Sequence, residues 1–233
     1  MADGRAPRGF GFGHYACDPD FEEQFVEWYQ TQHVPDAIAT GFYTHGSMFH
    51  HTSSNIPADE SKYLLLYEIP HRDVEAALAN VYPHFAEIQK DFDQQKGARR
   101  VFGGMYHIRE REYDNHQPKP TNSVLVLRME IDPAKVANTL AWYRGAHLPE
   151  AVKKGSPYHT AYLGERAATS PAPTLPDTTT QFLAIYESER GTAAKLAREF
   201  FELVPESTWT PAAKISRISS FYRVSPTLSS PTR

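Results

Sequence analysis

Two stretches of the sequence, WYQTQHVPDA at residues 28–37 and WYRGAHLPEA at residues 142–151, spell nearly the same decamer. Trp, Tyr, His, Pro and Ala recur in register, and Asp36 is matched by the similar Glu150. The offset from residue 28 to residue 142 recurs elsewhere in the chain, where it pairs Asp18-Pro19 with Asp132-Pro133, Gly41 with Gly155, and His45 with His159. Self-similarity at a fixed spacing marks repeat architectures, so we expect two copies of a unit of about 110 residues.

Each half shows the same order of predicted elements. Periodicity and turn residues predict strands at 9–16, 42–49, 62–69 and 101–110 in the first half, and at 123–131, 158–165, 181–188 and 215–224 in the second. Helices are predicted from Asp18 to the region of Pro35 and Gly41, and at 73–92, 134–154 and 192–204. Each half is then a ferredoxin-like β-α-β-β-α-β unit, an α+β fold. We expect a first unit at 1–114, a linker at 115–122 and a second unit at 123–233.

Composition limits the classes of function. The 233 residues are 40% hydrophobic, with a net charge of −4 and a pI near 6.3, so no basic surface favours nucleic acid. Cys17 is the single cysteine, which excludes a disulfide within the chain and favours a reducing compartment. No apolar run is long enough to predict a membrane span or a secretory signal. We therefore expect a cytoplasmic protein.

A β-α-β-β-α-β unit whose first helix ends in WY…H-x-P-[DE] resembles the dimeric α/β-barrel superfamily, and its EthD-like branch in particular. The resemblance covers both decamers and the order of elements, and so nearly the whole chain. It implies a barrel in which two sheets close on each other, with both units here supplied by one chain. It also implies a broad range of chemistry: cofactor-free isomerases, cyclases, decarboxylases and dehydratases, anthrone-type oxygenases, and haem-binding enzymes. A homodimer of the tandem chain is a further expectation.

The histidine in each decamer is the first candidate for acid–base chemistry, because its side chain titrates near neutrality. His33 is expected to act as general acid or base, or else to cap the carbonyls where Pro35 ends the helix. Alternation along the strand 42–49 would place His45 and Tyr43 on one face, so the two could serve His33 as partners. The remaining catalytic candidates are His84, beside Pro83 on the second helix, and Tyr67, which could orient a carbonyl or be a core aromatic.

A second group of residues is expected to contact the substrate. It contains the aromatic residues and histidines Trp28, Tyr29, His14, His107, His147 and His159. His14, His84 and His107 have no histidine twin in the second half, which favours the first half as the active one.

The sequence predicts no metal site, because it has no H-E-x-x-H or Cys-x-x-Cys spacing. No cofactor is expected. Haem is an alternative, with His33, His84 or His107 as its axial ligand.

The functional expectation is a cofactor-free enzyme of the cyclase, dehydratase, decarboxylase or isomerase type. Its substrate would be a small aromatic, lactone or polyketide-like molecule of secondary metabolism. Two alternatives are an oxidoreductase, either a cofactor-free monooxygenase or a haem enzyme, and a non-catalytic protein that binds a small molecule.

Overall fold

The computed structural model describes residues 7–56, 60–93, 95, 97–114, 119–167, 181–190, 213–224 and 228–229. The helix predicted at 192–204 lies outside the described residues. None of the described helices is both long and apolar enough to cross a membrane.

Eight antiparallel strands close into one barrel, which confirms the α+β barrel expected from the sequence. The first half contributes β1 (Gly9–Cys17), β2 (His45–His51), β3 (Tyr63–Ile69) and β4 (Ala98–Tyr113). The second half contributes β5 (Ser123–Ile131), β6 (Thr160–Arg166), β7 (Phe182–Ser188) and β8 (Ala213–Arg223). The order is β3-β1-β4-β6-β7-β5-β8-β2, and β2 pairs with β3 to close the circle. The short strand β9 (Leu228–Ser229) also pairs with β2. The two halves therefore join at β4–β6 and at β8–β2.

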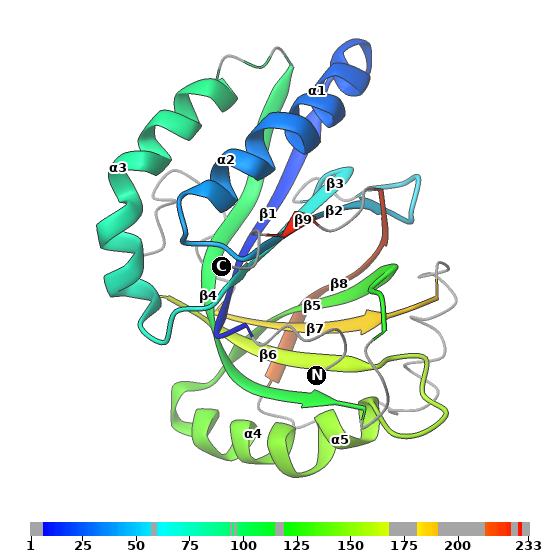
Figure 1. Cartoon of the computed structure of the whole chain (residues 1–233). Helices are drawn as coiled ribbons and strands as arrows, with labels where there is room; N and C mark the ends of the chain where they lie inside the picture. The colour runs from blue at the N-terminus through cyan, green and yellow to red at the C-terminus, as the bar shows by residue number, and fades with distance from the viewer. Residues whose placement is uncertain are drawn as a thin grey trace.

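Helices cover the outside of the barrel on two opposite sides (Figure 1). In the first half, η1 (Pro19–Phe21), α1 (Glu22–Trp28), η2 (Tyr29–His33) and α2 (Val34–Ala39) follow one another directly, and α3 (Val74–Asp93) lies nearby. In the second half the sequence is η3 (Pro133–Lys135), α4 (Val136–Trp142), η4 (Tyr143–His147) and α5 (Leu148–Ala151). One apolar cluster fills the barrel and one lies under each group of helices.

Successive residues of strand β1 point alternately to the barrel core and to the helices. Phe10 and Phe12 point into the barrel core, whereas Gly9 and Gly11 face the helices. A Cβ on Gly11 would lie 3.0 Å from the ring of Tyr43. Glycine at this position thus lets a tyrosine ring rest directly against the strand.

The repeated decamer forms a widened π turn in both halves. The N–H of Val34 donates to the carbonyl of Tyr29, and the N–H of Leu148 donates to that of Tyr143, five residues back in each case. The next residue is proline, which has no N–H and whose ring clashes with the carbonyl four residues earlier in a regular helix. The wider turn accommodates this proline, and such turns frequently occur at functional sites.

A β-bulge interrupts the ladders β1–β4 and β5–β8 at the same point. Beyond it, Tyr15 pairs with Arg100 in the first half and Met129 pairs with Ile215 in the second. A bulge re-aims the side chains that follow it. Arg100 and Ile215 therefore hold corresponding places in the two halves.

A buried polar cluster inside the barrel joins the two halves. Glu60, in the loop before β3, accepts a hydrogen bond from Ser219 and lies 3.1 Å from Nε2 of His51. Its Oε1 is 3.8 Å from Nη2 of Arg128, whose guanidinium lies over the Phe102 ring at 4.9 Å. Glu60 is 5% exposed and Arg128 only 2%. Both charges are thus removed from water and depend on each other.

Candidate functional site

In the first half, helix and sheet side chains meet in an aromatic cluster, here named site A: Trp28, Tyr29, His33, Tyr43 and Tyr67. The centroid of the His33 ring lies 4.9 Å from that of Trp28 and 4.6 Å from that of Tyr29. The Tyr29 and Tyr67 hydroxyls are hydrogen-bonded, and the Tyr43 ring lies 4.6 Å from the Tyr67 ring. Three predicted catalytic residues, His33, Tyr43 and Tyr67, are thereby linked through Tyr29.

His33 is a neutral base at pH 7. The residue as a whole is partly exposed, but its Nδ1 atom is fully buried. Burial, with a smaller contribution from the charge of Arg100, lowers the pKa of His33 to about 3. Burial also raises the pKa of Tyr29, Tyr43 and Tyr67, so their hydroxyls stay protonated. Site A combines one neutral imidazole with several hydroxyl groups in an aromatic environment.

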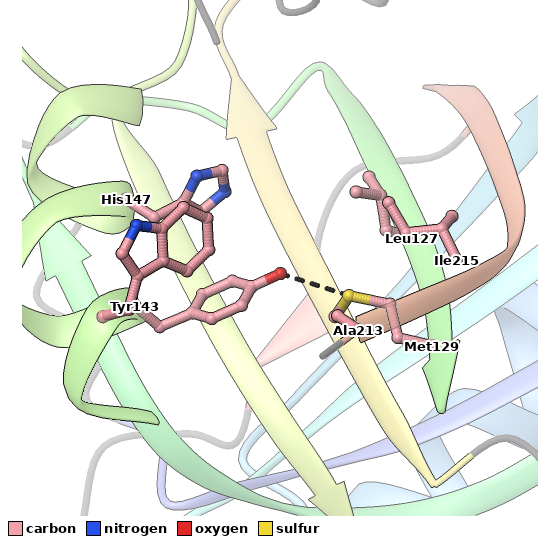
Figure 2. Close-up of a pocket in the computed structure, with 7 residues that line it drawn as sticks. Leu127, Met129, Tyr143, His147, Ala213 and Ile215 are labelled. Atoms are coloured by element: carbon pink, nitrogen blue, oxygen red, sulfur yellow. Dashed lines mark hydrogen bonds between the residues drawn. The ribbon is translucent and has the colours of Figure 1, made fainter. Parts of the chain in front are cut away.

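The second half holds the corresponding cluster, site B: Trp142, Tyr143, His147, Tyr158 and Tyr186. The His147 ring stacks on Trp142 at 4.6 Å and meets Tyr143 edge-on at 4.8 Å. Figure 2 shows His147 and Tyr143 reaching from the helix towards the strands, where the Tyr143 hydroxyl donates to the Met129 sulfur at 3.1 Å. His147 is only 4% exposed. The decamer thus builds the same aromatic frame twice.

The His147 imidazole has a fixed hydrogen-bond partner. Its Nε2 lies 2.7 Å from the Tyr186 hydroxyl. Burial lowers the pKa of His147 to about 4, and burial raises the pKa of Tyr186. Near pH 7 the tyrosine is protonated and the imidazole neutral, so the two groups share one hydrogen bond whose direction is set by the His147 tautomer.

A small cavity lies beside His147. Its lining consists of Leu127, Met129, Trp142, Tyr143, His147, Ala213 and Ile215 (Figure 2). The cavity volume is about 10 Å³, enough for about one water molecule. Ligand pockets for organic molecules measure about 300 Å³ or more. This cavity is therefore too small for an aromatic substrate.

Removing the hydroxyl that binds His147 is expected to destabilise the second half. Tyr186→Phe removes the hydrogen-bond partner of the buried Nε2 atom, which should cost about 1–2 kcal/mol of unfolding free energy. Urea unfolding measures the loss. The control is Tyr222→Phe, because Tyr222 is 39% exposed and its change should stay within about 0.5 kcal/mol. Equal losses in the two variants would contradict a buried, structural role for the Tyr186 hydroxyl.

Strand pairing corrects the expected match between His45 and His159. The N–H of His159 donates to the Glu187 carbonyl at 3.0 Å, and the N–H of Thr44 donates to the Glu68 carbonyl at the same distance. Thr44, not His45, therefore corresponds to His159. The decamers match at one offset and the following strands at an offset one residue longer, which a simple alignment misses.

One residue earlier, Tyr43 and Tyr158 correspond. Each packs on the tyrosine of the neighbouring strand, Tyr43 on Tyr67 at 4.6 Å and Tyr158 on Tyr186 at 5.6 Å. The sequence comparison did not identify this pair.

The prediction that His45 shares a face with Tyr43 is wrong. Strand β2 begins at His45, so Tyr43 lies in the preceding turn, where the alternation of a strand does not apply. The His45 Nδ1 is 3.4 Å from a carboxylate oxygen of Glu68, which faces the barrel because its neighbour Tyr67 faces the helices. The structure therefore does not bring His45 to His33.

Four other predicted histidines lie elsewhere in the fold. His84 is exposed on α3, and His107 pairs with Glu75 at 2.7 Å between β4 and the start of α3. His14 is buried inside the barrel at 1% exposure, and His159 is buried at 2%. None of these placements brings the histidine into the aromatic frame around His33.

Three residues near site A were not predicted as site residues from the sequence: Tyr15, Met105 and Arg100. The Tyr15 ring lies 5.9 Å from the Tyr29 ring, and the Tyr43 hydroxyl donates to the Met105 sulfur at 3.5 Å. Arg100 reaches the site from beyond the bulge in β4. Alternation along β1 could have identified Tyr15, but a bulge leaves no signature from which to place Arg100.

The described residues do not fit a haem. A proximal histidine must turn a ring nitrogen towards an open pocket large enough for the macrocycle. His33 packs against two aromatic rings with Nδ1 buried, His107 is paired with a carboxylate, and His84 stands on the surface. His147 faces a cavity of only about 10 Å³.

Comparison with known proteins identifies structural neighbours only. No family model matches the sequence, and no curated protein matches it. A mutant chlorite dismutase from Candidatus Nitrospira defluvii is similar with a TM-score of 0.59 and 10% identity, over 95% of this chain and 93% of that one. A candidate monooxygenase from Fusobacterium nucleatum subsp. nucleatum has a TM-score of 0.58 and 7% identity, over 94% of each chain. An anthrone oxidase-like protein has a TM-score of 0.54 and 8% identity, over 95% and 92%.

These neighbours correct the main functional expectation. A cyclase, dehydratase, decarboxylase or isomerase is the wrong class, because the neighbours are named as monooxygenases, an anthrone oxidase-like protein and chlorite dismutases. The names give no support to a polyketide substrate either. They agree with the oxidoreductase alternative. At this level of identity the likeness establishes the fold alone: the chain has the same α+β barrel as these neighbours.

Proposed function

We propose that this chain is an oxidoreductase, a cofactor-independent oxygenase that acts on a small aromatic substrate at site A. The observation that carries the proposal is the packing of the His33 imidazole against Trp28 and Tyr29, whose hydroxyl is bonded to that of Tyr67. An oxygenase without a cofactor must first remove a proton from its substrate, and a neutral imidazole in a site shielded from water can accept it. The names of the structural neighbours support the reaction class.

The reaction requires a substrate with an acidic CH₂ group conjugated to an aromatic carbonyl. His33 accepts one proton, and the electron pair that remains spreads onto the carbonyl oxygen. The carbanion forms a carbon–oxygen bond with O₂, and the peroxide anion takes the proton back from His33. The resulting hydroperoxide loses water to leave a second carbonyl. In sum, CH₂ and O₂ give C=O and H₂O, so no external reductant is consumed. The hydroxyl pair of Tyr29 and Tyr67 uses only one of its two hydrogens in the bond between them, and the other would stabilise the negative oxygen by hydrogen bonding.

Site A suits this role better than site B. The His147 Nε2 is held by Tyr186, and the adjacent cavity has room for about one water molecule. His33 is partly exposed, whereas His147 is only 4% exposed. In this proposal site B keeps a structural role.

The proposal also covers how the chain arose, whether it forms a homodimer, and where it is located. Matching π turns and matching bulges in the two halves support a tandem duplication of a ferredoxin-like unit of the EthD-like branch, with units at 1–114 and 123–233. One chain then supplies the whole barrel, and a homodimer would be a pairing of complete barrels. A cytoplasmic location belongs to the same proposal.

Oxygen uptake tests the proposed function. The purified chain, incubated with an anthrone in air-saturated buffer, is expected to consume one O₂ for each quinone formed, without added metal or reductant. An oxygen electrode and the quinone absorbance give the two rates. Uptake that matches the spontaneous oxidation of the anthrone would reject the oxygenase proposal, and binding without turnover would favour the non-catalytic alternative.

A further inference from the structure

Sites A and B differ in charge at one pair of corresponding positions, which is occupied by Arg100 in the first half and by Ile215 in the second. Each lies beyond the β-bulge, opposite Tyr15 in the first half and opposite Met129 in the second. In site B, Ile215 and Met129 both line the cavity beside His147. The corresponding pair in the first half, Tyr15 and Arg100, is therefore directed at site A.

Local contacts agree with this placement. The Tyr15 ring lies 5.9 Å from the Tyr29 ring of site A. The Arg100 Cδ lies 3.5 Å from the position that a Cβ on Gly103 would take, so the two residues face the same side of the sheet. Arg100 is half-buried, and its charge acts on both His33 and Tyr43. A positive charge thus stands where the second half has an aliphatic side chain.

We infer that site A binds a planar aromatic anion, and that Arg100 is the residue that selects this anion over a neutral analogue. The inference rests on the proposed function, since it names the substrate class of the same site. A guanidinium is always charged and presents a planar set of donors that matches a carboxylate, phenolate or enolate oxygen. The surrounding tyrosine and tryptophan rings supply flat apolar faces for the ring of the ligand.

The chemistry of the other members of site A fits an anion. Trp28, Tyr29, His33, Tyr43 and Tyr67 carry no negative charge, and the tyrosine hydroxyls can donate hydrogen bonds. Site B has no positive charge at the corresponding place. Its wall has Leu127, Met129 and Ile215 where site A has Gly13, Tyr15 and Arg100. The first half is therefore the selective half of the barrel.

Binding of two matched probes tests the inference. 2-Naphthoate and the neutral 2-naphthamide have the same ring system, and calorimetry under anaerobic conditions measures their affinities without turnover. The full chain is expected to bind 2-naphthoate about tenfold or more tightly than the amide, as one charge-assisted contact implies. Arg100→Ile, which introduces the residue found at the corresponding place of site B, should abolish this preference.

Arg99→Ile is the matched control, because Arg99 is the exposed neighbour on the same strand. It removes the same charge and should keep the preference. Arg100→Lys retains the charge and should keep part of it, which provides a second variant if Arg100→Ile does not fold. No binding of 2-naphthoate, equal binding of both probes by the unaltered chain, or an equal effect of Arg99→Ile overturns the inference.

The two proposals can fail separately. If anthrone oxidation fails but the Arg100-dependent preference is present, the oxygenase proposal falls and the anion site stands. If oxidation occurs and the preference is absent, the oxygenase proposal stands and the anion site is rejected.

Discussion

Replacing Glu60 with glutamine is expected to lower the free energy of unfolding by about 3 kcal/mol or more. The substitution removes the negative charge that faces Arg128, which is 2% exposed, and weakens the contact with His51. Breaking a buried pair from one side leaves the other charge without compensation in a medium that solvates it poorly. Because Glu60 and His51 belong to the first half and Arg128 to the second, the loss should appear in the unfolding of the whole barrel.

Lowering the pH should also reduce the free energy of unfolding, because it protonates Glu60. Burial alone would raise the pKa of Glu60, but hydrogen bonds from His51 and Ser219, with the charges of His14 and Arg128, lower it below its ordinary value of 4.5. A carboxyl whose folded pKa is lowered stabilises the fold above its unfolded pKa. This contribution is lost as the pH falls below 4.5 and through the lowered folded value. Glu60→Gln should therefore show less loss of stability over that range than the unaltered chain.

Chemical denaturation at pH 7 and at pH 4 measures both effects. Glu165→Gln is the control, since Glu165 pairs with Arg109 at the surface, where an ion pair contributes about 0–1 kcal/mol. A loss at pH 7 as small as that of the control would show that the buried cluster does not stabilise the barrel.

The fold could be predicted from the sequence because its evidence is local and occurs twice. The decamer fixes a helix end, and alternation such as that of Phe10 and Phe12 with Gly9 and Gly11 fixes the faces of a strand. The exact correspondence of the halves could not be predicted. The insertion of one residue between the decamer and the next strand moves the match of His159 from His45 to Thr44, and only hydrogen bonding reveals it.

The candidate site was predicted in part for the same reason. His33 and Tyr29 are four residues apart on one helix, so the sequence shows that they are neighbours. Tyr67 joins them through a hydrogen bond across the sheet–helix interface, which depends on how strand and helix pack. Arg100 depends on a bulge, and Glu60 lies in a loop without any pattern. Contacts made by packing or by irregular backbone have no counterpart in the periodicity of a sequence.

His33→Gln is expected to reduce the rate of oxygen uptake by about 10²–10⁴-fold, because glutamine cannot accept the substrate proton. His147→Gln is the matched variant at the same position of the second decamer, and we expect its rate to stay within a few-fold of the unaltered chain. Equal losses in the two variants would contradict the assignment of catalysis to site A.

The pH dependence offers a sharper test of His33 as the base. A histidine with its ordinary pKa of 6.5 would lose activity below that pH, whereas burial keeps His33 neutral until the pH approaches its pKa of about 3. We expect kcat/KM to show no acid limb near 6.5, and such a limb would contradict the assignment. Stability provides a readout without any substrate. The unfolded chain takes up the proton near pH 6.5 and the folded chain does not, so stability falls as the pH drops through this window. His33→Gln removes that uptake and should reduce the fall, even in a preparation that turns over nothing.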